Sequence, residues 1–177
     1  MKVRHSVRTR YKVIIVMAVL IILAMAGVGV FLFRRLNQTV IPNLILKKVG
    51  FNVYAPVLPK QAWYIKLGDS SYNSTAGVLT LRVHQTDGPM TIVVTEQNQP
   101  DAFNAIPGYY NKLLEDLNQY NTVPVGLGTF TLTHPTELAG GQSAVADIDS
   151  TLMFAHPSKN LNQTEWTVFF DTLSKVN

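Results

Sequence analysis

The chain has 177 residues, with 15 Lys and Arg against 11 Asp and Glu, no cysteine, and 47% hydrophobic residues. That length allows one ordinary domain with a real core, and a charged fraction of 15% excludes a disordered polyelectrolyte. The absence of cysteine excludes disulfides, a thiol catalyst and a cysteine-based zinc site.

The net charge of +4 and the pI near 9.4 conceal an uneven charge distribution. Residues 1–50 carry nine basic side chains and no acidic one, whereas residues 51–177 carry six basic and eleven acidic side chains, a net −5. Most of these basic residues lie on either side of a long apolar run, as expected beside a membrane segment. The pI therefore carries no argument for nucleic-acid binding.

That segment is Val13–Phe33, an uncharged apolar run of 21 residues. At a rise of 1.5 Å per residue it spans about 32 Å, close to the hydrocarbon thickness of about 30 Å. The run predicts one transmembrane helix that holds the protein in the lipid bilayer. The excess of Lys and Arg before it predicts a cytoplasmic tail over residues 1–12 and an extracytoplasmic location for the rest.

A cleaved signal peptide is the competing interpretation of the same segment. Ala24-Met25-Ala26 has the small-x-small form of a cleavage site and follows a basic region and an apolar run. Cleavage after Ala26 leaves an apolar stub at the new N-terminus, so we favour an uncleaved signal anchor. Both interpretations export the C-terminal part of the chain.

Residues 34–50 are predicted to form a juxtamembrane connector, with a short helix that Pro42 begins and Gly50 ends. Residues 51–177 then form the extracytoplasmic domain.

Alternation of apolar and polar residues predicts strands at 63–67, 79–83 and 90–94. The polar residues 70–77 predict a loop after the first strand. Asp87-Gly88 signals a tight turn, so the second and third strands are expected to form a hairpin.

A helical period follows between Pro107 and Asn121, where apolar residues recur at Tyr110, Leu113, Leu114 and Leu117. Beyond it the sequence predicts three short strands, over residues 129–133, 143–148 and 152–156.

Asn162 and Glu165 have the spacing of a capping box at the start of a second helix. An apolar stripe continues that helix through Trp166, Phe169, Phe170, Leu173 and Val176. We expect the stripe to bury itself on the sheet, and a partner-docking helix is the alternative. The predicted fold class is α+β: a single transmembrane helix, then an antiparallel sheet with helices packed on one face.

The segment Asp147-Ile-Asp149-Ser-Thr151-Leu152 resembles the D-x-D-x-T motif of haloacid-dehalogenase phosphatases. The resemblance implies a nucleophilic Asp147, an acid/base Asp149 and a bound Mg²⁺. That family places the motif on the first strand of a doubly wound domain, with further catalytic residues far downstream, and 26 residues follow Thr151 here. We therefore expect two solvent-facing aspartates along a strand and no phosphatase site.

His84, His134 and His156 lack the spacing of a metal-binding motif, and only convergence in the fold would unite them. Ser143 lacks the glycine pattern of a nucleophile elbow. The sequence thus predicts no catalytic residue, no metal site and no cofactor, and it leaves any ligand-binding residues unknown.

The run Phe51–Pro59, the strand that starts at Trp63 and the hairpin that ends in Thr95-Glu96-Gln97 lie within residues 51–100. This region resembles membrane-anchored bacterial extracytoplasmic domains of unknown function, some of them in envelope-stress regulators. The resemblance implies an exported domain and assigns it no catalytic residue.

We therefore expect a single-pass membrane protein, not an enzyme, whose exported domain binds or senses an unidentified ligand. Its expected partners are the bilayer, through Val13–Phe33, and a protein of the cell envelope; nucleic acid is not one of them. A structural subunit of a secretion- or conjugation-type envelope assembly is the alternative, and an exported hydrolase is a minor one.

Overall fold

The computed structural model describes residues 40–57, 62–134 and 141–177. The chain divides into two units, Met1–Leu36 and Asn37–Asn177, and every described residue belongs to the second. No helix in these described ranges is long and apolar enough to cross a membrane. The predicted anchor Val13–Phe33, with the cleavage site after Ala26, lies outside them.

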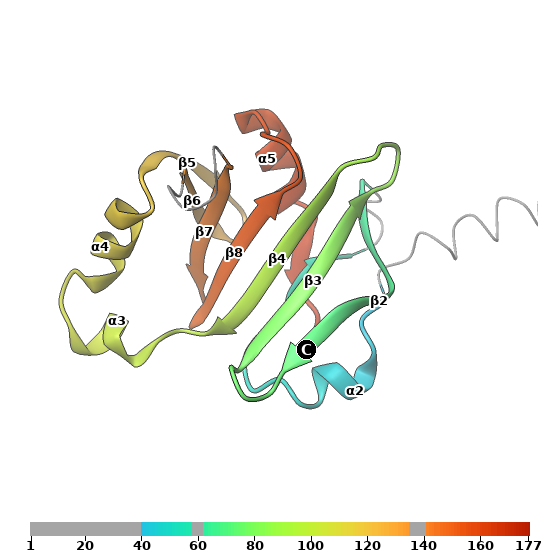
Figure 1. Cartoon of the computed structure of the whole chain (residues 1–177), viewed down its shortest axis with the longest axis horizontal. Helices are drawn as coiled ribbons and strands as arrows, with labels where there is room; N and C mark the ends of the chain where they lie inside the picture. The colour runs from blue at the N-terminus through green and yellow to red at the C-terminus, as the bar shows by residue number, and fades with distance from the viewer. Residues whose placement is uncertain (1–39, 58–61, 135–140) are drawn as a thin grey trace, which may run out of the picture. The chain divides into compact units, whose positions relative to one another are not determined.

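The elements follow one another along the second unit, and their labels are those of Figure 1. In chain order they are α2 (Asn43–Leu46), β1 (Tyr54–Pro56), β2 (Trp63–Asn73), β3 (Val78–Gln85), β4 (Thr91–Asn98), α3 (Asp101–Ala105), α4 (Tyr109–Asp116), β5 (Gln119–Val125), β6 (Gly128–Thr133), β7 (Ser143–Ile148), β8 (Thr151–Pro157), α5 (Gln163–Phe170) and β9 (Leu173–Lys175).

Seven of the described strands form one sheet in the order β2-β3-β4-β8-β7-β6-β5, and every neighbouring pair is antiparallel (Figure 1). The strands β1 and β9 pair antiparallel as a separate two-stranded ribbon. The prediction of an α+β domain with an antiparallel sheet is confirmed. The hairpin predicted around Asp87-Gly88 is confirmed as well, as β3 and β4.

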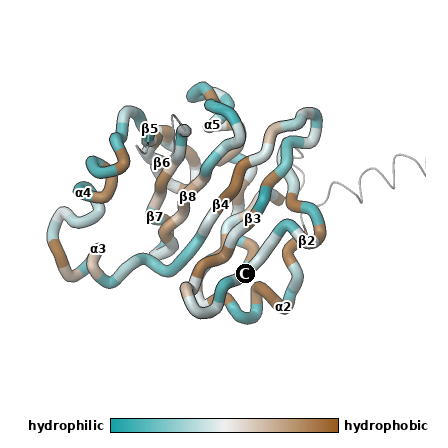
Figure 2. The backbone as a smooth tube through the Cα atoms, viewed as in Figure 1, coloured by the Kyte–Doolittle hydropathy of each residue, from teal (hydrophilic) through white to brown (hydrophobic). Residues whose placement is uncertain are grey.

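One face of the sheet, here called the first face, carries the main core. Hydrophobic and polar stretches alternate along β3 and β4 (Figure 2), and the core side chains of β4 are Ile92 and Val94. The ribbon β1–β9 and the helix α5 supply the other layer of this core. The stacked rings of Phe130 and Phe170, with centroids 3.6 Å apart, join β6 to α5. The aromatic stripe of α5 is thus buried on the sheet, as predicted.

The opposite side, the second face, is covered in part by α3 and α4. Leu114 of α4 packs against Val145 of β7 and Leu152 of β8, and Phe103 of α3 joins this smaller cluster. The prediction that the helices pack on one face is therefore wrong. The reason is that β7 and β8 carry apolar side chains on both faces, so each face needs its own cover.

The strand β2 extends into the loop predicted at 70–77 and ends at Asn73, so the loop before β3 is only residues 74–77. Its pairing with β3 jumps from Ile65↔Val83 to Ser70↔Leu81, so residues 66–69 form a bulge opposite a single residue of β3. An edge strand accommodates such a bulge because its outer side has no partner to disturb.

The predicted helix over 107–121 is shorter than expected, since α4 ends at Asp116. Asn118 then adopts a left-handed conformation with φ 52° and turns the chain into β5, an unpredicted strand. Pro124 lies within β5, where its missing N–H is tolerated because β5 is the other edge of the sheet.

The helix α5 begins as predicted, because Asn162 and Glu165 form a reciprocal capping box. It ends early, at Phe170, where the Thr172 hydroxyl donates to the carbonyl oxygen of Phe169 at 2.6 Å. Leu173 opens β9 instead of continuing the helix, and its side chain enters the same core.

Within the predicted connector, α2 packs on the domain rather than standing free of it. Ile41, Ile45 and Leu46 lie against the main core, and Val49 is buried in it. Pro42 precedes the helix as expected, and Lys47 follows its last residue.

Candidate functional site

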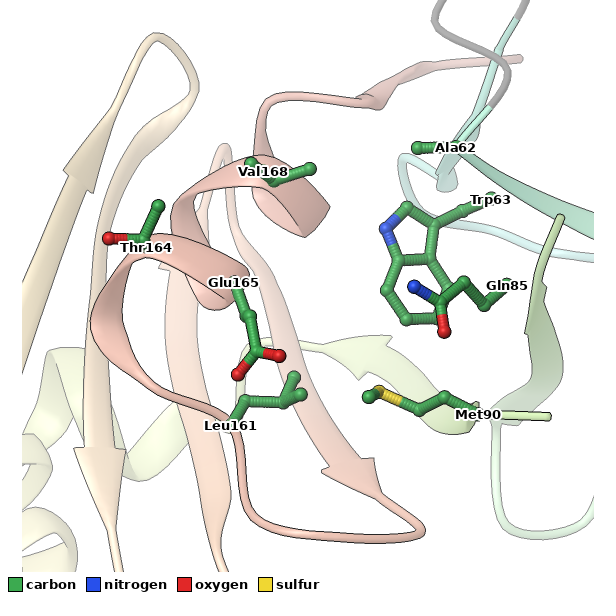
Figure 3. Close-up of a pocket in the computed structure, with 8 residues that line it drawn as sticks. All are labelled: Ala62, Trp63, Gln85, Met90, Leu161, Thr164, Glu165 and Val168. Atoms are coloured by element: carbon green, nitrogen blue, oxygen red, sulfur yellow. The ribbon is translucent and has the colours of Figure 1, made fainter. Parts of the chain in front are cut away.

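A small pocket opens between α5 and the β2–β4 end of the sheet (Figure 3). It is mostly apolar and is lined by Ala62, Trp63, Gln85, Met90, Leu161, Thr164, Glu165 and Val168. Its volume is about 140 Å³. Pockets for cofactors and drug-sized ligands measure roughly 300–1,000 Å³, whereas an apolar cavity of about 150 Å³ holds one benzene-sized group. The pocket therefore fits one apolar side chain or a group of that size.

The apolar walls of the pocket come from separate segments of the chain. Met90, just before β4, and Leu161, just before α5, point toward each other (Figure 3). The indole of Trp63 faces α5, and the edge-to-face contact with Phe169, at 5.2 Å between centroids, fixes its orientation. Val168 lines the pocket with 49% of its surface exposed, so a partner can reach it.

The two larger polar side chains of the lining are Glu165 and Gln85. Glu165 accepts from the backbone N–H of Asn162 at 2.8 Å as half of the capping box. Gln85 lies under the turn at Gly88, where a Cβ atom would collide with its Oε1. The lining thus offers apolar contact and shape rather than a convergent set of charges.

The three histidines beyond the predicted span lie in three different places. His84 contacts Asp69 at 2.6 Å between Nε2 and Oδ2, and His134 stacks on Tyr120 with centroids 4.4 Å apart. His156 contacts a different residue, the hydroxyl of Ser143, through Nδ1 at 3.2 Å. Within the described part of the chain, no three His, Asp or Glu side chains gather as a metal site would require.

The Ser143–His156 pair joins β7 to β8 across neighbouring strands. Ser143 is 5% exposed, and its own carbonyl oxygen accepts from the hydroxyl of Thr133. The contact therefore fits a cross-strand hydrogen bond inside the sheet better than an open nucleophile.

The two aspartates of the D-x-D-x-T segment do not both point to solvent from one strand, so that expectation is wrong. Asp147, in β7, accepts from the Nε2 of Gln99 at 2.6 Å; its burial raises its pKa, against the lowering effect of this bond. Asp149 lies in the following turn with φ 47° and accepts from the Tyr54 hydroxyl at 2.8 Å. Asp147 thus belongs to the strand and Asp149 to the turn that follows it, and each carboxylate has its own hydrogen-bond partner.

Glu96 is the titratable group that the sequence interpretation missed. It is fully buried in β4, and both of its carboxylate oxygens accept from the backbone N–H of Tyr54 in β1. Burial raises the pKa of Glu96 to about 8, and the Tyr54 N–H lowers it in part. The alternation Ile92, Val94, Glu96 placed it on the core face, and that signal was present in the sequence.

The pocket was not foreseen either, because its lining comes from residues scattered over more than a hundred positions. Comparison of the chain with protein-family models, with curated proteins and with solved structures gives no match.

Proposed function

We propose that the protein is a single-pass membrane protein whose exported domain binds an envelope protein through the pocket beside α5. The observation that carries the proposal is the pocket itself, an apolar opening of about 140 Å³ sized for one inserted side chain. The role proposed is binding and not catalysis, since the one carboxylate of the lining, Glu165, already serves the capping box of α5.

The proposed anchorage rests on the sequence. Val13–Phe33 is uncharged and long enough to cross a bilayer, and nine basic residues with no acid surround it within residues 1–50. The resemblance of residues 51–100 to membrane-anchored extracytoplasmic domains supports the same arrangement.

Topology is testable cleanly because the chain has no cysteine. One cysteine is introduced at Arg4 or at Lys112, and intact cells are treated with a membrane-impermeant maleimide. We expect labelling at position 112 alone, with labelling at position 4 only after lysis. A tag placed before Lys2 reports on processing: its retention supports the uncleaved anchor, and its loss means cleavage. Labelling at position 4 in intact cells would overturn the orientation.

The binding proposal is tested by filling the pocket from its rim. Val168→Trp places a bulky ring at the opening, and Lys112→Trp places the same ring on the exposed surface of α4 as the matched control. After crosslinking in native membranes and purification, we expect a partner that the first variant loses and the control retains. Equal recovery from both variants would refute a role for the pocket.

The same experiment separates the alternative functions. A single large complex of fixed stoichiometry, insensitive to Val168→Trp, would favour a structural subunit of an envelope assembly. Hydrolysis of an ester or amide probe that disappears with Ser143→Ala would favour the exported hydrolase.

A further inference from the structure

The two most exposed large apolar side chains of the described residues belong to two segments in one corner of the domain, α2 and the bulge of β2. Leu67 is 76% exposed and Leu44 is 74% exposed, while the next such residue, Ile106, reaches 50%. The backbone N–H of Val40 donates to the carbonyl oxygen of Ile65 at 3.1 Å. That bond holds the segment leading into α2 beside the bulge of β2, so the two leucines belong to adjoining segments (Figure 1).

Both leucines are exposed although neighbouring residues of the same elements pack into the core. Ile45 and Leu46, the next residues of α2, pack inward, and Ile65 just before the bulge is fully buried. The bulge is what turns residues 66–68 outward, because it breaks the register between β2 and β3. The local structure of each segment thus directs its leucine into solvent. Leaving this apolar surface in water is unfavourable in free energy.

The surroundings of the two leucines are basic. Lys47 and Lys48 follow α2, and Lys66 precedes Leu67; all three are exposed. No acidic residue occurs before Asp69, while residues 69–177 carry four basic and eleven acidic side chains. Asp69, at the end of the bulge, contacts His84 at 2.6 Å. The corner thus has the opposite charge from the rest of the domain.

The predicted span ends at Phe33, and six residues separate it from Val40. Even fully extended, that connection reaches only about 25 Å. With Val13–Phe33 in the bilayer as proposed above, Val40 lies no more than about 25 Å from the end of the span. Apolar side chains flanked by Lys are the pattern that binds the interface of an anionic membrane.

We infer that Leu44, Lys47, Lys48, Lys66 and Leu67, named here the α2–bulge surface, dock on the anionic lipid surface beside the anchor. The leucines enter the headgroup region and the lysines contact lipid phosphates. This inference rests on the membrane anchorage proposed above. It gives the domain a fixed orientation, with one corner on the membrane and the acidic remainder directed away.

The test uses the full chain in vesicles of phosphatidylcholine alone or with phosphatidylglycerol. Leu67→Cys carries an environment-sensitive NBD label, and Lys112→Cys on α4 is the matched control. Headgroup-attached nitroxide lipids report the contact. We expect quenching at position 67 in the anionic vesicles and none at position 112. Replacing Lys47, Lys48 and Lys66 with Gln should lower the docked-to-undocked ratio by roughly fivefold for each lysine.

Three results would count against the inference, and they are distinguishable. Release of the chain from vesicles by alkaline carbonate would overturn the proposed anchorage and this inference with it. Retention of the chain without quenching at position 67 would overturn docking alone. An NBD shift that grows with the protein-to-lipid ratio, without nitroxide quenching, would assign the surface to a second copy of the chain.

Discussion

The backbone N–H of Tyr54 donates to both carboxylate oxygens of Glu96, at 3.1 and 3.2 Å. One backbone donor in the ribbon β1–β9 thus meets the one acidic side chain that is fully buried among the described residues. The contact joins the ribbon to the centre of the sheet. It also makes the attachment sensitive to the proton on Glu96.

That sensitivity predicts a pH dependence of stability. The pKa of Glu96 is raised from 4.5 to about 8 in the folded domain, mainly by burial, so the folded state holds a proton that the unfolded chain releases. The resulting stabilisation is complete below about pH 4.5 and is lost as the pH rises through about 8. The slope is at most about 1.4 kcal/mol per pH unit.

Glu96→Gln should flatten this slope, because an amide carries no titrating proton. The measurement is urea unfolding at pH 5, 6.5 and 8, followed by tryptophan fluorescence, which reports on this domain because both tryptophans lie in it. Asp147, whose pKa is also raised by burial, contributes a slope of the same sign. Identical slopes in the parent and the variant would contradict the assignment to Glu96.

The contact of Phe170 with Phe130 predicts a large loss of stability on truncation. Phe170→Ala removes a fully buried ring that stacks on Phe130 and Trp166, and should cost about 3–5 kcal/mol in unfolding free energy. Val168→Ala on the same helix is the control, and should change stability by about 0.5 kcal/mol or less because Val168 is half exposed. Similar losses from the two variants would mean that α5 does not pack as described.

The capping box of α5 predicts a moderate effect. Asn162→Ala removes the acceptor of the Glu165 backbone N–H, a bond of 2.9 Å, and should destabilise the domain by about 1 kcal/mol. Lys159→Ala, at an exposed position three residues before the N-cap, should leave the urea midpoint unchanged. A midpoint for Asn162→Ala equal to the parent's would show that the cap adds nothing.

The hydrogen bond between Tyr54 and Asp149 predicts energetic coupling. Tyr54→Phe and Asp149→Asn each weaken the 2.8 Å bond, and a double-mutant cycle should give a coupling of about 1 kcal/mol at pH 7. The coupling should vanish for Tyr54 paired with Asp147→Asn, because Asp147 bonds Gln99 instead. Additive losses in the first cycle would indicate that the bond does not form in solution.

The sequence predicted those elements whose signal is local. The alternation in β3 and β4, the turn at Asp87-Gly88 and the capping box at Asn162 each depend on residues a few positions apart, and each prediction is confirmed. The class of the fold follows from their order along the chain.

What the sequence could not predict depends on distant partners. The stripe through Leu173 keeps a helical period, yet Leu173 pairs with Pro56 of β1 and is therefore extended. The strand β5 was not predicted, because a strand tolerates Pro124 only at the edge of a sheet, and the strand order is not visible in the sequence. The sequence likewise did not show that β7 and β8 are covered on both faces, because that depends on where α4 packs.

The same dependence governs the candidate site. Trp63, Met90 and Leu161 each fit an ordinary core position in the sequence, and only the approach of α5 to the β3–β4 turn makes them a pocket. Asp147 and Asp149 resembled a catalytic pair because spacing alone does not show that β7 ends between them and that Asp149 lies in the turn.

The ribbon β1–β9 brings together segments from opposite ends of the domain. Val53 donates to the side chain of Asn177 across 124 positions, and Asn177 donates back to the carbonyl oxygen of Phe51. Joining segments so far apart in the chain costs more conformational entropy than closing the β3–β4 hairpin. During synthesis or passage through a translocation channel, β1 therefore lacks its partner strand until residues 173–175 have followed. Delivery of those residues completes the ribbon, whereas the β3–β4 hairpin has both of its strands well before then.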